Sequence, residues 1–134
     1  MEKDSLKILV VDDERDVVRY ISMVLEDEGY DVDTVLNGRD ALKYIEASPP
    51  DLICLDVMMP GESGLTLFKN LRENTRFREI PVFIISAIEK EAEFDITNYI
   101  SDAAISPPER YFEKPIEVDR LISAVKQIGV DGNK

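Results

Sequence analysis

Five short apolar runs alternate along the chain with segments that show the hydrophobic period of an α-helix. The apolar runs cover residues 6–11, 30–36, 51–55, 80–86 and 110–113. The helical segments cover residues 14–28, 39–47, 65–73, 89–104 and 118–128. Strands that alternate with helices are typical of parallel sheets, and nearly continuous apolar strands indicate that helices cover both faces. We therefore predict an α/β fold built from five βα units.

Right-handed crossover connections leave few ways in which these five strands can pair. We predict a doubly wound, five-stranded parallel sheet of order 2-1-3-4-5. This order places the carboxyl ends of the first and third strands beside each other, at the point where the winding direction reverses. Because α/β folds bind ligands at such a point, the predicted topology also predicts where the functional residues lie.

Length and composition favour one globular domain. The chain has 134 residues, of which 44% are hydrophobic and 33% are charged. We expect a single domain over residues 1–134, with a core over about 6–128 and a polar, frayed tail over 129–134. No apolar stretch approaches the roughly 20 residues that a membrane-spanning helix needs. No signal-peptide pattern precedes the first apolar run, so we expect a cytoplasmic protein.

The charge balance is strongly acidic, with 28 acidic and 16 basic residues and a net charge of −12. This argues against direct binding to nucleic acid, which needs clustered Lys and Arg, and against adsorption to anionic membranes. We expect protein partners. The absence of histidine excludes a histidine-based catalytic triad and a histidine-ligated zinc site. The one cysteine, Cys54, lies in an apolar run and is predicted to be a core residue.

Charged residues stand where three of the predicted strands end. Asp12 and Asp13 follow the first apolar run, Asp56 follows the third, and Lys114 follows the fifth. Because the carboxyl ends of parallel strands share one edge of the sheet, we expect these side chains to meet. Carboxylates placed together repel one another and need a cation. The candidates are a hard divalent ion, which prefers oxygen ligands, and the ammonium of Lys114.

Each of these residues, taken alone, has an ordinary structural explanation. An aspartate at a strand end often caps a helix or sits in solvent, and a serine such as Ser86 is most often a cap. A lone surface lysine is usually solvated, and a lone tyrosine such as Tyr111 is usually part of the core. The arrangement of all of them along one predicted edge favours a shared functional site.

Four motifs at successive strand ends make the chain resemble a two-component response-regulator receiver domain of the chemotaxis-regulator type. The motifs are Val10-Val11-Asp12-Asp13-Glu14, Leu55-Asp56-Val57-Met58-Met59-Pro60-Gly61, Ile85-Ser86-Ala87 and Glu113-Lys114-Pro115. The resemblance runs from about residue 6 to residue 128. It implies a flavodoxin-like fold and a phosphoprotein that acts as a signalling domain in a phosphorelay, rather than as an enzyme.

The resemblance also implies the residues of a phosphorylation site. Asp56 matches the aspartate that accepts the phosphoryl group and becomes an aspartyl phosphate. Asp12, Asp13 and Asp56 match the ligands of Mg²⁺, and Met58 matches the residue that adds only its backbone carbonyl.

Three further positions match residues that respond to the phosphoryl group. Ser86 matches the hydroxyl residue that hydrogen-bonds to it, and Lys114 matches the lysine that pairs with its oxygens. Tyr111 matches the aromatic switch residue that turns inward together with Ser86. The bond between Lys114 and Pro115 is a candidate cis peptide, because X-Pro bonds lower the free-energy difference between cis and trans.

As a receiver domain, the chain would take its phosphoryl group from a sensor histidine kinase or a histidine phosphotransfer protein. The switched surface of the fourth helix, fifth strand and fifth helix would then control a downstream protein target. The segment between Ser86 and Lys114 is longer than is usual in the family and lacks its Gly-Ala-Asp/Asn-Asp-Tyr run. We therefore hypothesise an unusual partner surface, and we do not expect a standard symmetric dimer there.

Two apolar residues near the site predict a long-lived phosphoprotein. Met58 follows Asp56 by two positions, and Ile88 follows Ser86 by two. In the family these positions guide or block the water that hydrolyses the aspartyl phosphate. Neither side chain can orient a water molecule, so we predict slow dephosphorylation.

Three other functions remain open at this point. A cofactor-binding flavodoxin-like protein needs a phosphate loop after the first strand, where Asp12 and Asp13 instead repel phosphate. A phosphatase of the haloacid-dehalogenase type needs a second acid two residues after its nucleophile, where this chain has Met58. A constitutive binding module with a vestigial site is the third alternative.

Overall fold

The computed structural model describes residues 6–57, 64–86 and 106–132. Within these residues, five strands pair side by side in a sheet of order β2-β1-β3-β4-β5, and every pairing is parallel. The strands are β1 (Lys7–Val11), β2 (Asp31–Val35), β3 (Leu52–Asp56), β4 (Val82–Ser86) and β5 (Arg110–Glu113). The predicted doubly wound, flavodoxin-like topology is confirmed.

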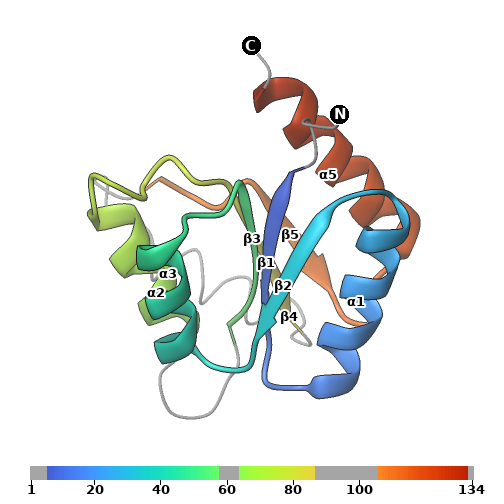
Figure 1. Ribbon diagram of the computed structural model, residues 1–134, viewed down its shortest axis with the longest axis horizontal. Helices are drawn as coiled ribbons and strands as arrows, with labels where there is room; N and C mark the ends of the chain where they lie inside the picture. Colours follow the sequence, from blue (N-terminus) through green and yellow to red (C-terminus); the bar gives the residue numbers. More distant parts are fainter. Residues whose placement is uncertain (1–5, 58–63, 87–105, 133–134) are drawn as a thin grey trace.

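Helices cover both faces of this sheet. The helices of the described segments are α1 (Arg15–Asp27), α2 (Gly38–Ala47), α3 (Gly64–Glu73) and α5 (Val118–Gly132). Figure 1 shows α2 and α3 on one side of the strands and α1 and α5 on the other. The helix predicted over residues 89–104 lies outside the described residues. No helix in the described part of the chain is long and apolar enough to cross a membrane.

The strand residues point alternately into two hydrophobic layers, as the period of a β-strand requires. In β1, Leu9 and Val11 pack toward α2 and α3, whereas Ile8 and Val10 pack toward α1 and α5. Cys54 lies in the second layer and is 1% exposed, which confirms its prediction as a core residue. Burial raises the pKa of its thiol to about 12, so the thiolate is absent at neutral pH.

The ends of two helices show how the sequence sets local structure. Gly29 follows α1 with a φ of 97°, a conformation that favours glycine, and its N–H donates to the Glu26 carbonyl at 2.9 Å. At the other end of the chain, α5 continues to Gly132, four residues past the predicted end at 128. Ile128 packs against the core, and Gly129 lies beside Leu6. This packing extends the helix through a glycine that by itself disfavours it.

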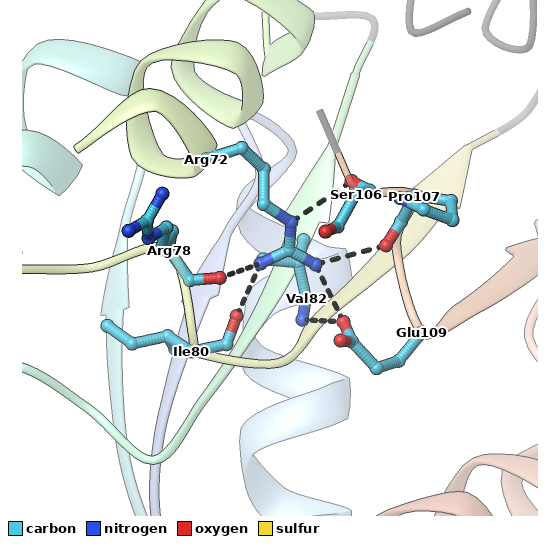
Figure 2. A network of polar contacts seen from close by, with 7 residues as sticks. All are labelled: Arg72, Arg78, Ile80, Val82, Ser106, Pro107 and Glu109. Atoms are coloured by element: carbon cyan, nitrogen blue, oxygen red, sulfur yellow. Dashed lines mark hydrogen bonds and ion pairs between the residues drawn. The ribbon is translucent and has the colours of Figure 1, made fainter. Parts of the chain in front are cut away.

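A buried arginine ties together the edge of the sheet at which β4 and β5 begin, which we call the amino edge. The Arg72 side chain, in the last turn of α3, is 2% exposed, and its guanidinium makes an ion pair of 2.9 Å with Glu109. Figure 2 shows the acceptors gathered around it, which are the backbone carbonyls of Ser106, Pro107, Arg78 and Ile80 and the carboxylate of Glu109.

These contacts match the chemistry of a guanidinium group. The described residues supply five hydrogen bonds to Arg72, of 2.7–3.2 Å, and guanidinium has five N–H donors. Glu109 also accepts the Val82 N–H at 2.7 Å and donates its own N–H to the Val82 carbonyl at 2.9 Å. Arg72 therefore joins α3 to the starts of β4 and β5. The sequence pattern did not single out this network.

Candidate functional site

The opposite edge of the sheet, where the strands end, carries the charged residues named from the sequence. Asp12 directly follows β1, Asp56 is the last residue of β3, Ser86 is the last residue of β4, and Lys114 directly follows β5. The register aligns these ends, because Asp56 pairs with Ile85 and Ser86 pairs with Glu113. We call this the carboxyl edge. Parallel pairing brings the four positions to one edge of the sheet, and the strand order sets their spacing along it.

The predicted acidic cluster is present at the carboxyl edge. Among the described residues, Asp12, Asp13 and Asp56 each offer a carboxylate oxygen, and these oxygens all lie within 4.8 Å of one another. Asp12 and Asp56 are 2% and 3% exposed, whereas Asp13 is exposed. A set of carboxylate oxygens that includes neither sulfur nor imidazole fits a hard divalent cation such as Mg²⁺ or Ca²⁺.

Lys114 reaches into this cluster. Its ammonium lies 2.9 Å from Asp12 Oδ2 and 3.6 Å from Asp56 Oδ2. Burial by itself lowers the pKa of the ammonium, but hydrogen bonds to Glu14 and Asp12 and the nearby Asp56 carboxylate raise it above the usual value for lysine. The side chain therefore stays cationic. The Lys114–Pro115 peptide bond is cis, as the sequence suggested.

Glu14 is a further residue of the site. It is the last residue of the first motif, but the sequence indicated no role for it. Its Oε1 lies 2.6 Å from the Lys114 ammonium, and its side chain is 59% exposed. The residues are 100 positions apart, so the pairing depends on the tertiary fold. The only signal in the sequence was an acid directly after Asp12 and Asp13.

Gly64 places the start of α3 against the acidic cluster. A Cβ atom at this position would lie 2.2 Å from the Asp56 carbonyl oxygen and 2.7 Å from Val57 Cα. Both neighbours are backbone atoms, which cannot move aside easily. Only glycine permits this close approach, which fixes the backbone that carries Asp56.

Of the remaining predicted residues, the structure describes Ser86 and Tyr111. The Ser86 side chain is buried at the carboxyl edge. Tyr111 lies in β5 opposite Ile84, and the residue is 39% exposed. Met58 and Ile88 lie outside the described residues. The structure therefore brings Asp12, Asp13, Asp56, Ser86 and Lys114 to one edge and leaves Tyr111 on the surface beside it.

Residues 8–126 of the chain match the family model of the response regulator receiver domain. The chain belongs to this family. The family match favours a receiver domain over the flavodoxin-like cofactor protein and the phosphatase that the sequence had left open. A receiver domain is a signalling domain of two-component systems, and the acidic cluster at the carboxyl edge is in keeping with that membership.

Two curated relatives of this receiver domain differ in how much of their own length the match covers. Protein PilG of Pseudomonas aeruginosa is 31% identical over 125 residues, which cover 93% of this chain and 88% of PilG. The alkaline phosphatase synthesis transcriptional regulatory protein PhoP of Bacillus subtilis is 38% identical over 122 residues, 91% of this chain and 48% of PhoP. The chain thus spans about half the length of PhoP and nearly all of PilG.

Solved structures share the same fold. The receiver domain of a Francisella response regulator aligns with a TM-score of 0.80 at 29% identity and covers 96% of this chain and 99% of its own. The receiver domain of a signal transduction histidine kinase from Syntrophus aciditrophicus aligns with a TM-score of 0.82 at 28% identity, covering 95% and 92%. Receiver domains of both kinds of signalling protein are therefore similar to this one.

Proposed function

We propose that this receiver domain accepts a phosphoryl group on Asp56 from a phosphohistidine of a sensor histidine kinase or a histidine phosphotransfer protein. The observation that carries the proposal is the placement of Asp56 at the carboxyl edge. Its carboxylate lies within 4.8 Å of those of Asp12 and Asp13 and 3.6 Å from the Lys114 ammonium. A buried acid beside a cation and two further acids suits a nucleophile that must approach an anionic phosphate.

In the proposed reaction, a carboxylate oxygen of Asp56 attacks the phosphorus of the donor. A P–O bond to the carboxylate forms as the P–N bond to the histidine ring breaks, and the electron pair of that bond remains on the ring nitrogen. The negative charges of carboxylate and phosphate repel each other. Lys114 offsets part of this repulsion, because its ammonium stands beside the carboxylate.

We propose that Asp12, Asp13 and Asp56 hold Mg²⁺, with the backbone carbonyl of Met58 as a further ligand. The donor set fits the ion, since the three aspartates and the carbonyl all offer oxygen atoms. When bound, Mg²⁺ would offset part of the negative charge of the acidic cluster and of the phosphoryl group. Asp13 is the most exposed of the three acids, so it is the one that solvent and an incoming ion can reach.

We propose Ser86 and Tyr111 as the switch that reports phosphorylation. Ser86 would donate its hydroxyl to a phosphoryl oxygen, and Tyr111 would turn from its exposed position toward the space that Ser86 leaves. The change would alter the surface around β5 and α5, which would control a protein partner in the cytoplasm. Met58 and Ile88 would leave the aspartyl phosphate slow to hydrolyse.

Incubation with acetyl phosphate and Mg²⁺, followed by intact-mass measurement, tests this function. The parent protein should gain the mass of one phosphoryl group, and Asp56→Asn should gain none, because an amide is not a nucleophile toward phosphorus. Asp51→Asn is a matched control, because Asp51 precedes the same strand at its other end and should leave the modification unchanged. Modification of Asp56→Asn to the level of the parent would show that another residue accepts the group.

A further inference from the structure

Among the described residues, the carboxylate nearest to the Lys114 ammonium is that of Glu14, which lies outside the acidic cluster. Its Nζ lies 2.6 Å from Glu14 Oε1, against 2.9 Å from Asp12 Oδ2 and 3.6 Å from Asp56 Oδ2. A separation of 3.6 Å is too long for a good N–H···O hydrogen bond. The ammonium is therefore held toward the start of α1 rather than toward Asp56.

The local structure of Glu14 directs its side chain to Lys114. Glu14 is the N-cap residue of α1, with φ −92° and ψ 109°, and its side chain makes no capping hydrogen bond. Its backbone N–H donates to Asp12 Oδ1 at 3.0 Å, which anchors the residue beside the cluster. An N-cap residue usually bonds to its own helix through a short polar side chain. Here the longer carboxylate crosses to the loop after β5 instead.

We propose that Glu14 is a positioning residue that holds Lys114 back from Asp56 until a phosphoryl group arrives. This inference rests on the proposed phosphorylation of Asp56. A phosphoryl group brings three acceptor oxygens and a charge near −2, so it attracts the ammonium more strongly than one carboxylate does. The Glu14 side chain is 59% exposed, so water screens its ion pair and the ammonium can leave it.

The experiment compares Glu14→Gln with the parent in two measurements. The first is the rate at which acetyl phosphate and Mg²⁺ modify Asp56, followed by intact mass. We expect modification to be about twofold to fivefold faster, the range that loss of one exposed ion pair allows. The second is the ¹⁵Nζ resonance of Lys114 without donor, which should shift because the ammonium loses its nearest carboxylate. Glu14→Ala removes the acceptor altogether and should reproduce both effects.

Glu113→Gln is the matched control, because it removes the same charge from the residue next to Lys114. Glu113 is exposed, and none of the ion pairs found in the described segments joins it to the ammonium. We expect the rate to change much less and the Lys114 resonance to stay in place. If the two Gln variants react equally fast, the effect is one of general charge and the proposal fails.

An unchanged Lys114 resonance in Glu14→Gln, or slower modification of that variant, would also overturn the proposal. Slower modification would mean that Glu14 assists Lys114 rather than restraining it. A parent protein that gains no phosphoryl group would overturn the proposed function itself. That result is distinct from equal rates in the two variants, so the two failures can be told apart.

Discussion

The two edges of the sheet each hold a shielded cationic side chain, but they surround it with different partners. At the amino edge, the guanidinium of Arg72 meets four backbone carbonyls and the carboxylate of Glu109, among the described residues. At the carboxyl edge, the described partners of the Lys114 ammonium are three carboxylates, and Asp13 stands close by. One edge is balanced in charge, whereas the other has an excess of negative charge.

This difference separates a structural network at the amino edge from the proposed functional site at the carboxyl edge. Arg72 and Glu109 satisfy each other and the ends of the chain segments around them, so their contacts add to the stability of the fold. The acids of the carboxyl edge repel one another, and one lysine cannot neutralise all of them. Such an edge lowers stability, and an excess of negative charge suits the cation and the phosphoryl group that we propose for it; local instability of this kind is typical of functional sites.

The largest change in stability should come from removing the Arg72 side chain at the amino edge. Arg72→Met should lower the free energy of unfolding by about 3 kcal/mol, because it leaves buried carbonyls and Glu109 without their donor. Urea denaturation measures the change. Arg78→Met is the control, since Arg78 is exposed and contributes only its backbone carbonyl to the network. A loss of less than 1 kcal/mol in Arg72→Met, on the scale of a surface ion pair, would show that the network is not important for stability.

Mg²⁺ should stabilise the folded protein through the carboxyl edge and not through the amino edge. Mg²⁺ at a hundred times its dissociation constant should raise the free energy of unfolding by about 2.7 kcal/mol, because the ion binds only the folded cluster. Asp13→Asn should weaken this gain, and Glu109→Gln should leave it intact. Thermal unfolding with and without Mg²⁺ provides the measurement. An equal gain in the parent and in Asp13→Asn would place the ion elsewhere.

The smallest effects should come from neutralising one acid at each edge in the absence of Mg²⁺. The two variants should change the free energy of unfolding in opposite directions, which makes them the sharpest test of the comparison. Asp13→Asn should raise the free energy of unfolding by about 1 kcal/mol, because it removes repulsion between neighbouring carboxylates. Glu109→Gln should lower it by about 1 kcal/mol, because it weakens a charge-assisted hydrogen bond to Arg72. Urea denaturation of both variants decides the matter, and changes of the same sign would remove the distinction between the edges.

Much of the fold and the position of the candidate site followed from short-range patterns. The apolar runs located all five strands within a residue or two. The rule on right-handed crossovers left few strand orders, and the doubly wound order among them is the one observed. Because the acids follow β1 and β3, that order also placed Asp12 and Asp56 together. The positive φ of Gly29 just after α1 likewise has a reason that involves only its own backbone, since glycine lacks a Cβ atom.

Other features could not be predicted because they join residues far apart in the sequence. Arg72 reads as one more charged residue of an amphipathic helix until α3 packs beside the start of β5. Glu14 reads as an ordinary first-turn acid until the loop after β5 brings Lys114 within 2.6 Å. The extension of α5 likewise brings Gly129 beside Leu6, from the opposite end of the chain. None of these contacts follows from the hydrophobic periodicity of the sequence.

The sequence by itself determined the strands and helices of the described residues and the edge at which the acids gather. Hydrophobic periodicity is a property of neighbouring residues, and right-handed crossovers leave few orders in which the strands can pair. Only the tertiary structure decided how charge is distributed within each edge. Electrostatic partners are set by distances of a few ångströms between side chains that the chain brings together only when it folds. For this reason Arg72 and Lys114, both cations in the sequence, lie in different electrostatic surroundings in the folded protein.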